Sequence, residues 1–503
     1  MTEQQRSGSA NPKMQQPTTG RLADAKSASY VRAVNVPEAR ASGFTARYML
    51  VSDIAYVLTA AEAGITPQAS ARRLLQALLE LLDKADDLDS TRPPGDVVAQ
   101  REAWVAEKAG REHTAWLHLA RNRGESLRCY LPRMFFRHVL HEEQQAVAAL
   151  LRVLVAKAEP VLEAVSPNYH HLQHSGFTTL GEYLLSWAAV FEPHLERMAQ
   201  VDKRLDKGPS TFGGRTNLNA LYNRVAQRLG FSDRARLRRD GIWMHSQFTE
   251  PFFVLSMVAV DLGRLAQDMR IWMTPEFGLF EPADEHAGGS SALPHAKVPF
   301  GLQAVMGGAT IAATRLAGEM AASVNPSEGS EPLYQSASLY SLATDIVAST
   351  RYMADVVEKG RFNLEEMKRK AVLDYAGSSE AHDRLVYDFG VPFRTGHRVL
   401  GAMARAHHEG EPMPDIKALL RQETGRDVDI DQNEIMDIVL GRKFWPTTFD
   451  FETLRKVWTG FAERTATAER SLRAPGPVER AAATLIADAN VWLSTTGAGG
   501  ASG

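Results

Sequence analysis

Four long stretches of this 503-residue chain repeat apolar residues at intervals of three and four positions, at residues 147–161, 184–198, 252–272 and 339–356. Residues at this spacing lie on one face of an α-helix, and long helices with such a face pack side by side in a bundle. No convincing alternation of apolar and polar residues predicts a β-strand. We therefore expect an all-α protein organised around a long central bundle, and apolar helices of this length indicate an oligomer.

Shorter helical patterns on both sides of these stretches predict two small helical domains that flank the bundle. The first residues are polar and lack the apolar segment of a secretory signal, and the last residues are rich in glycine and alanine. The expected order is a disordered N-terminal extension at 1–20, an N-terminal helical domain at 21–122, the bundle at 123–374, a C-terminal small helical domain at 375–476, and a terminal helix with a flexible tail at 477–503.

Charge and cysteine content exclude several classes of partner. The 57 basic and 60 acidic residues nearly balance, without the basic stripe that nucleic acid binding needs. No run of about 20 uncharged apolar residues could cross a membrane. The only cysteine, Cys129, cannot form an intrachain disulfide and provides no thiolate cluster for a metal. These features fit a cytoplasmic protein, and we expect neither a metal nor a cofactor.

Four polar segments interrupt the helical patterns, and the first contains His118, Arg121, Asn122 and Arg123. Two guanidinium groups so close together could bind carboxylates or phosphate. By itself this segment is better explained as a solvated helix end with ordinary arginines. The fourth segment, at residues 323–331, is a break between helices with no evident chemistry of its own.

The second segment places His170, His171 and His174 within five residues, next to Gln173. A histidine here could transfer a proton near neutral pH. A metal site is the alternative, but adjacent histidines point in different directions from most backbones, and no cysteine or HExxH spacing supports it. The histidine cluster thus remains open between a structural role and proton transfer.

The third segment is the loop at residues 281–303, which separates two long helices. Gly288-Gly289-Ser290-Ser291 leaves the backbone free to approach a substrate and to present amides and hydroxyls to an anion, and Lys297 follows. A serine acts as a base only where amides or positive charge stabilise its alkoxide. No Gly-x-Ser-x-Gly elbow indicates acyl transfer. Composition alone favours a plain surface connection.

The order of these segments resembles the argininosuccinate lyase branch of the fumarase/aspartase superfamily, from about residue 45 to residue 473. The loop resembles the family signature Gly-Ser-Ser-Ile-Met-Pro-x-Lys-x-Asn-Pro, and the second segment resembles Pro-Gly-Tyr-Thr-His-Leu-Gln. The segments that carry the resemblance are residues 118–125, 167–173, 178–183, 272–278, 289–299 and 390–397.

This resemblance implies a homotetramer with a shared central bundle and active sites built from three subunits. The family chemistry is β-elimination, in which a loop serine removes a proton beside a carboxylate and a C–N or C–O bond breaks to release fumarate. Carried across, Ser290 is the base, and His171 protonates the leaving group or relays its proton. The resemblance assigns substrate contacts to His118, Arg121, Asn122, Arg123, His170, Gln173, Ser291, Lys297 and Gln303.

Several positions depart from the family pattern. Ala296 stands at the signature lysine, with Lys297 one position away, and Val298 replaces its asparagine. Gln303 stands where a glutamate charges the histidine partner, which makes His171 a weaker base. The fourth segment has lost an arginine and a glutamine of the pattern. Each lost charge-assisted contact costs ~1.5–3 kcal/mol, so a succinyl dicarboxylate should bind less well.

The sequence therefore predicts a carbon–nitrogen lyase of the ammonia- or amidine-lyase type, with altered specificity for a small-molecule substrate in specialised metabolism. The chain retains several residues of the family pattern, which favours this function. They are Gly289, Ser290, Arg121, His171 and Gln173. Two alternatives remain open, an ordinary argininosuccinate lyase and a catalytically silent scaffold or binding protein.

Overall fold

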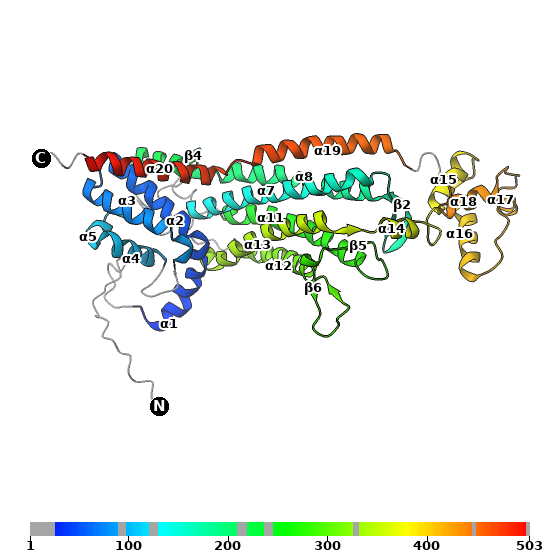
Figure 1. Cartoon of the computed structure of the whole chain (residues 1–503), viewed down its shortest axis with the longest axis horizontal. Helices are drawn as coiled ribbons and strands as arrows, with labels where there is room; N and C mark the ends of the chain where they lie inside the picture. The colour runs from blue at the N-terminus through cyan, green and yellow to red at the C-terminus, as the bar shows by residue number, and fades with distance from the viewer. Residues whose placement is uncertain are drawn as a thin grey trace, which may run out of the picture.

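The computed structural model describes residues 26–88, 97–119, 129–208, 219–235, 245–324, 331–444 and 449–498. The chain is mostly helical and elongated, with a small group of helices at each end of a long bundle (Figure 1). This architecture confirms the fold class expected from the apolar spacing.

Five long helices form the bundle, and the four repeating stretches lie within four of them. They are α7 (Leu131–Ala158), α8 (Leu180–Leu205), α11 (Ser246–Trp272), α12 (Phe300–Ala322) and α13 (Glu331–Lys359). Residues at the predicted spacing, such as Leu154, Phe191 and Leu262, are fully buried in one continuous core. Thr179 caps α8, because its hydroxyl accepts a hydrogen bond from the Glu182 amide. The bundle thus follows directly from the helical period.

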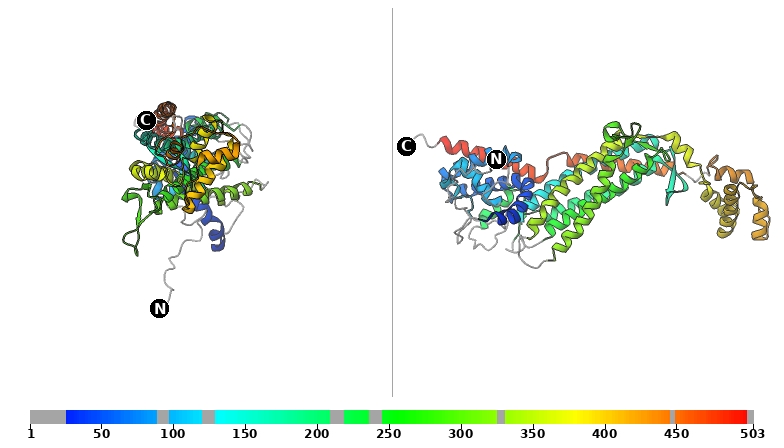
Figure 2. Two further views of the ribbon diagram at one scale, coloured as in Figure 1. Left: turned by 90° about the vertical axis from the view of Figure 1, so that its right-hand side faces the viewer. Right: turned by 90° about the horizontal axis from the view of Figure 1, so that it is seen from below.

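A second core lies at the N-terminal end of the bundle. Its main helices are α2 (Val36–Glu62), α3 (Gln68–Leu82), α4 (Val97–Ala109), α9 (Asn219–Arg228) and α20 (Pro477–Ala498). The short segments nearby are α1 (Ala28–Tyr30), η1 (Val31–Asn35), η2 (Ala85–Asp87) and α5 (Arg111–Thr114). Figure 2 shows α20 running alongside the N-terminal helices, so both ends of the described chain meet in this core.

A third core lies beyond the opposite end of the bundle (Figure 2). It is formed by α15 (Ser378–Tyr387), α16 (Phe393–Glu409), α17 (Ile416–Thr424) and α18 (Gln432–Val439), and α14 (Leu364–Ala371) connects it to the bundle. Helix α19 (Phe451–Leu472) returns along α7, where the Trp458 indole donates to the Val155 carbonyl at 3.0 Å. The segment expected in the C-terminal domain up to residue 476 therefore includes a helix that packs on the bundle.

The expectation of a chain without strands is wrong. Strands β1 (Val165–His170) and β2 (Gln173–Thr179) form an antiparallel hairpin, with Val165 opposite Thr179 and His170 opposite Gln173. Shorter pairs join β5 (Phe280–Glu281) to β8 (Arg361–Phe362), β6 (Gly288–Gly289) to β7 (Lys297–Val298), and, in parallel, β3 (Lys207–Gly208) to β4 (Asp233–Arg234). The remaining short helices are η4 (Glu159–Val161) and η5 (Asp284–His286).

Candidate functional site

Ser290 lies just beyond β6, in the hairpin that β6 and β7 close. Gly288 pairs with Val298 and Gly289 with Lys297, and the hairpin stands away from the bundle near the start of α12 (Figure 1). Ser290 Oγ accepts hydrogen bonds from the amides of Ala292 at 3.3 Å and Leu293 at 3.0 Å. Amides that donate to an oxygen stabilise negative charge on it, so this geometry favours the alkoxide of a serine base.

Lys297, at the start of β7, is bound by carboxylates of its own chain. Its Nζ lies 2.7 Å from Asp284 Oδ1 and 3.3 Å from Glu281 Oε1. These hydrogen bonds, chiefly that to Asp284, raise the pKa of Lys297 and lower the pKa of Asp284. Arg361, at 2.7 Å, and Lys297 together lower the pKa of Glu281. The ammonium group is therefore held at the base of the hairpin in this conformation.

His170, His171 and Gln173 surround the turn of the β1–β2 hairpin, and their side chains are exposed. His171 and Leu172 form the turn with φ angles of 55° and 59°. Two consecutive residues with positive φ are typical of a type I′ turn, which usually contains asparagine and glycine. Residues with larger side chains in this conformation are strained, and such strain is frequent at functional sites.

His174, the third histidine of the cluster, has a different environment. Its ring packs against Tyr169, with the ring centroids 4.9 Å apart, and its Nε2 lies 3.9 Å from Asp374 Oδ2. Burial lowers the pKa of His174. This histidine therefore joins the hairpin to the segment that follows α14, whereas His170 and His171 face outward.

His118 follows α5 in the N-terminal group of helices. Its Nε2 lies 2.8 Å from an Arg101 guanidinium nitrogen and contacts the Glu102 carboxylate. Arg101 also bonds Asp53 Oδ1 at 3.3 Å, and both of these side chains are almost completely buried. This ionic cluster was not predicted from the sequence, although charged residues within the apolar patterns of two helices were a signal for it. Arg121, Asn122 and Arg123 lie outside the described residues.

The described part of one chain does not bring the candidate residues together. Helix α5, which His118 follows, lies at one end of the molecule and the β1–β2 hairpin with His171 at the opposite end of the bundle, while β6, which precedes Ser290, lies between them along the long axis (Figure 1). Ser291 and Gln303, the latter in the first turn of α12, are exposed. Among the described residues, no hydrogen bond or ion pair joins Ser290 to His171 or His118.

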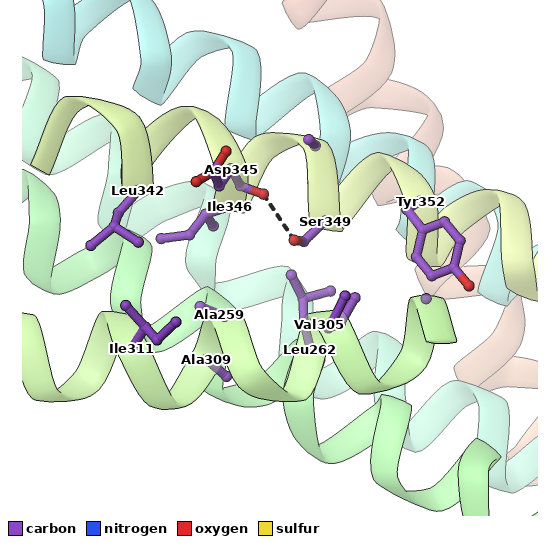
Figure 3. A pocket seen from close by; sticks show the side chains of 14 residues that line it. Ala259, Leu262, Val305, Ala309, Ile311, Leu342, Asp345, Ile346, Ser349 and Tyr352 are labelled. Atoms are coloured by element: carbon purple, nitrogen blue, oxygen red, sulfur yellow. Dashed lines mark hydrogen bonds between the residues drawn. The ribbon is translucent and has the colours of Figure 1, made fainter. Parts of the chain in front are cut away.

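A groove with a volume of about 480 Å³ runs between α12 and α13, over α11 (Figure 3). Apolar and small side chains line it, including Val305, Leu342 and Ile346, and Tyr352 lies at one end. Nearby, Ile311 of α12 is 54% exposed. A bundle helix thus presents an apolar face that the described residues of its own chain do not cover.

The protein family described as Lyase matches residues 24–313, which is more than half of the chain. The chain belongs to this lyase family of the fumarase/aspartase superfamily. The argininosuccinate lyase of Methanothermobacter thermautotrophicus is 26% identical to this lyase over 394 residues, covering 75% of this chain and 83% of the relative. That of Aquifex aeolicus is 29% identical over 366 residues, covering 70% and 77%. The resemblance read from the motifs is confirmed.

Solved structures share the fold of this lyase at low sequence identity. A variant of EDDS lyase with bound fumarate superposes with a TM-score of 0.76 and 20% identity, covering 94% of this chain and 97% of that one. A beta-carboxy-cis,cis-muconate cycloisomerase from Acinetobacter calcoaceticus gives a TM-score of 0.65 and 16% identity, covering 86% and 99%. These likenesses show the fold, and they do not identify the substrate.

The described residues of this lyase contain neither a membrane-spanning helix nor a cluster of metal ligands. None of the described helices combines the length and the hydropathy that a bilayer-spanning segment requires. No described His, Cys, Asp and Glu side chains gather in a group of three or more suited to a metal ion.

Proposed function

We propose that the protein is a carbon–nitrogen lyase that removes an amine-type leaving group from a small carboxylate substrate by β-elimination. The observation that carries this proposal is the environment of Ser290, whose Oγ receives two backbone amide hydrogen bonds within the family's signature loop. The relatives named argininosuccinate lyase, at 26% and 29% identity, support carbon–nitrogen chemistry. The similarly folded structure that holds fumarate supports an unsaturated acid as the product class.

In the proposed reaction, the Ser290 alkoxide removes the proton from the carbon beside the substrate carboxylate. The electron pair of that C–H bond forms the new C=C bond, and the C–N bond breaks. The amine leaves with the C–N electron pair and takes a proton from His171. An exposed histidine at a strained hairpin turn is placed to reach a neighbouring molecule, and histidine can transfer protons near neutral pH.

The distribution of site residues along the chain supports a homotetramer with shared sites. Ser290, His171 and His118 lie on separate parts of one molecule, so a common site requires more than one copy. The apolar groove between α12 and α13 offers the surface on which another copy would pack. Apolar bundle helices that the described residues of one chain leave uncovered fit this assembly, and the single cysteine fits a cytoplasmic location.

The loop also supports a specificity different from that for argininosuccinate. Ala296 stands at the position of the signature lysine, and Lys297 is bound to Asp284 and Glu281. Gln303 carries no charge at the start of α12. The loop thus offers fewer free charged groups than the family pattern does. We therefore propose a substrate less acidic than the usual succinyl compound.

A substrate panel tests the function. Purified protein is incubated with argininosuccinate, adenylosuccinate, aspartate, nitrogen-substituted succinates and the corresponding nitrogen-substituted propionates, which carry a single carboxylate, and new alkene absorbance is followed. We expect turnover of a nitrogen-substituted acid and slower turnover of argininosuccinate. Fast and preferred cleavage of argininosuccinate would instead support the ordinary enzyme of that name. Absence of turnover, with equal ligand binding by the parent and Ser290→Ala, would support a silent scaffold.

A further inference from the structure

Tyr352 of α13 contacts both limbs of the loop that carries Ser290. Its hydroxyl donates a 2.8 Å hydrogen bond to the carbonyl of His286, which lies shortly before β6. Its ring also meets the His286 ring edge-on, with the centroids 5.7 Å apart. On the returning limb, the phenol lies against Gly301 in the first turn of α12. One side chain from a rigid bundle helix therefore touches the loop where it leaves the bundle and where it returns.

The contact between Tyr352 and Gly301 is close. A Cβ atom at Gly301 would lie 1.9 Å from the Tyr352 hydroxyl oxygen and 2.2 Å from Cζ, so only glycine fits there. A second glycine behaves similarly, because a Cβ at Gly288 would lie 2.1 Å from the Phe300 ring. The base of the loop is therefore packed against aromatic rings on both limbs. Close packing of this kind leaves a segment few alternative orientations.

Besides the backbone pairing of Glu281 with Arg361, the other contacts at the base of the loop are mainly exposed ion pairs. Lys359 binds Glu285 at 2.6 Å, but both side chains are about half exposed, and Arg361, which binds Glu281, is 75% exposed. Exposed pairs of this kind hold a segment weakly. The Tyr352 hydroxyl is half-buried, and burial raises its pKa, so it remains a donor at neutral pH. Beyond the β5–β8 pairing, which holds the first residue of the loop, Tyr352 thus connects the bundle to both limbs of the loop.

We propose that Tyr352 is a positioning residue for Ser290, because it holds both limbs of the signature loop against α13 and so fixes the orientation of the hairpin. This inference rests on the proposed function, since the orientation of the hairpin affects turnover only if Ser290 is the base. The relationship between Tyr352 and the loop is itself testable without any substrate.

The first experiment measures loop motion with a nitroxide spin label on His295→Cys, at the exposed part of the hairpin. Native Cys129 is 0% exposed, so the introduced thiol is labelled selectively. Tyr352→Phe removes the hydroxyl and keeps the ring, and Tyr387→Phe makes the same change at a tyrosine that is 76% exposed elsewhere. We expect the label to move roughly twofold faster in Tyr352→Phe and unchanged in Tyr387→Phe. Equal motion in Tyr352→Phe and the parent would overturn the inference, whatever the activity.

A double-mutant cycle identifies the contact responsible. Gly301→Ala displaces the phenol and should also increase the rate of motion of the spin label. If both changes act through the same contact, adding Tyr352→Phe to Gly301→Ala should alter the motion less than it does in the parent. Fully additive effects would contradict the shared contact.

Turnover gives the last readout. With a substrate that the parent converts, Tyr352→Phe should lower kcat roughly threefold to tenfold and leave KM unchanged, because a misplaced base weakens the transition state rather than substrate binding. Unchanged kcat, or a rise in KM alone, would contradict the positioning role. If Ser290→Ala retains parental turnover, the proposed function fails, while the label still reports whether Tyr352 holds the loop.

Discussion

Lys297 Nζ lies 2.7 Å from Asp284 Oδ1, so this cation of the signature loop is bound within its own loop. The family resemblance leaves open whether this lysine replaces the missing signature lysine at Ala296. In the described conformation it stabilises the base of the hairpin, and Glu281 provides a second carboxylate at 3.3 Å. Because Lys297 is paired in this way, a single substitution at its carboxylate partner should change the positive charge that the loop offers to a substrate.

Asp284→Asn should weaken the hold on Lys297, which then keeps only the Glu281 carboxylate, and so make it more available to a second substrate carboxylate. We expect kcat/KM for argininosuccinate to rise roughly twofold to fivefold, a small change because the broken ion pair is exposed. Glu285→Gln is the control, since it breaks the neighbouring pair with Lys359 and leaves Lys297 bound. An equal rise in the control, or a fall in Asp284→Asn, would show that Lys297 does not limit dicarboxylate turnover.

Glu143 in α7 should make stability depend on pH. It is fully buried, Thr350 donates a 2.6 Å hydrogen bond to it, and burial raises its pKa from 4.5 to about 7. Because the folded pKa is raised, the stabilisation is complete below pH 4.5 and is lost as pH rises through about 7. Near pH 8, ionisation in the fold should cost up to about 3 kcal/mol.

Glu143→Gln keeps an acceptor for Thr350 and cannot ionise. We therefore expect it to melt higher than the parent at pH 8 and at the same temperature at pH 4.5. Melting curves between these pH values give the comparison, with the partly exposed Glu142→Gln as control. A Glu143→Gln difference independent of pH would show that this carboxyl does not titrate across neutrality.

The sequence predicted the bundle well because its signal is local. Leu154, Phe191 and Leu262 repeat at the helical period, and this alone fixes which face is buried. The β1–β2 hairpin gave no such signal, since a register shift after Asn168 interrupts the strand and its turn lacks the usual asparagine and glycine. Alternation of apolar and polar residues over so few positions does not distinguish a strand from a loop.

Parts of the candidate site depend on how distant segments pack, which spacing does not reveal. Motif order located Ser290 and His171, but it did not show that Lys297 would turn to Asp284. The Arg101 contact with Asp53 joins α4 to α2, and the Tyr352 contact with Gly301 joins α13 to α12. Residues that form such contacts between helices belong to no motif in the sequence, and their roles become clear only when their partners are known.

Association through α12 should depend on its exposed apolar face. We expect the parent to sediment at about four times the 55.4 kDa chain mass. Ile311→Glu places a charge on this face and should give smaller species without activity. Val491→Glu makes the same change at a residue of α20 that is 61% exposed and should remain tetrameric. A monomeric parent would contradict shared active sites.

The role of Ser290 is tested most directly by comparing Ser290→Ala with Ser291→Ala on the best substrate of the panel. Both changes remove one hydroxyl from adjacent positions of the loop, but only Ser290 Oγ accepts the Ala292 and Leu293 amides. Initial rates of alkene formation and substrate affinity are measured for both variants. We expect Ser290→Ala to bind substrate normally and to lose roughly 10²–10⁴ in kcat, while Ser291→Ala remains active. Parental kcat in Ser290→Ala would contradict the assignment of Ser290 as the base.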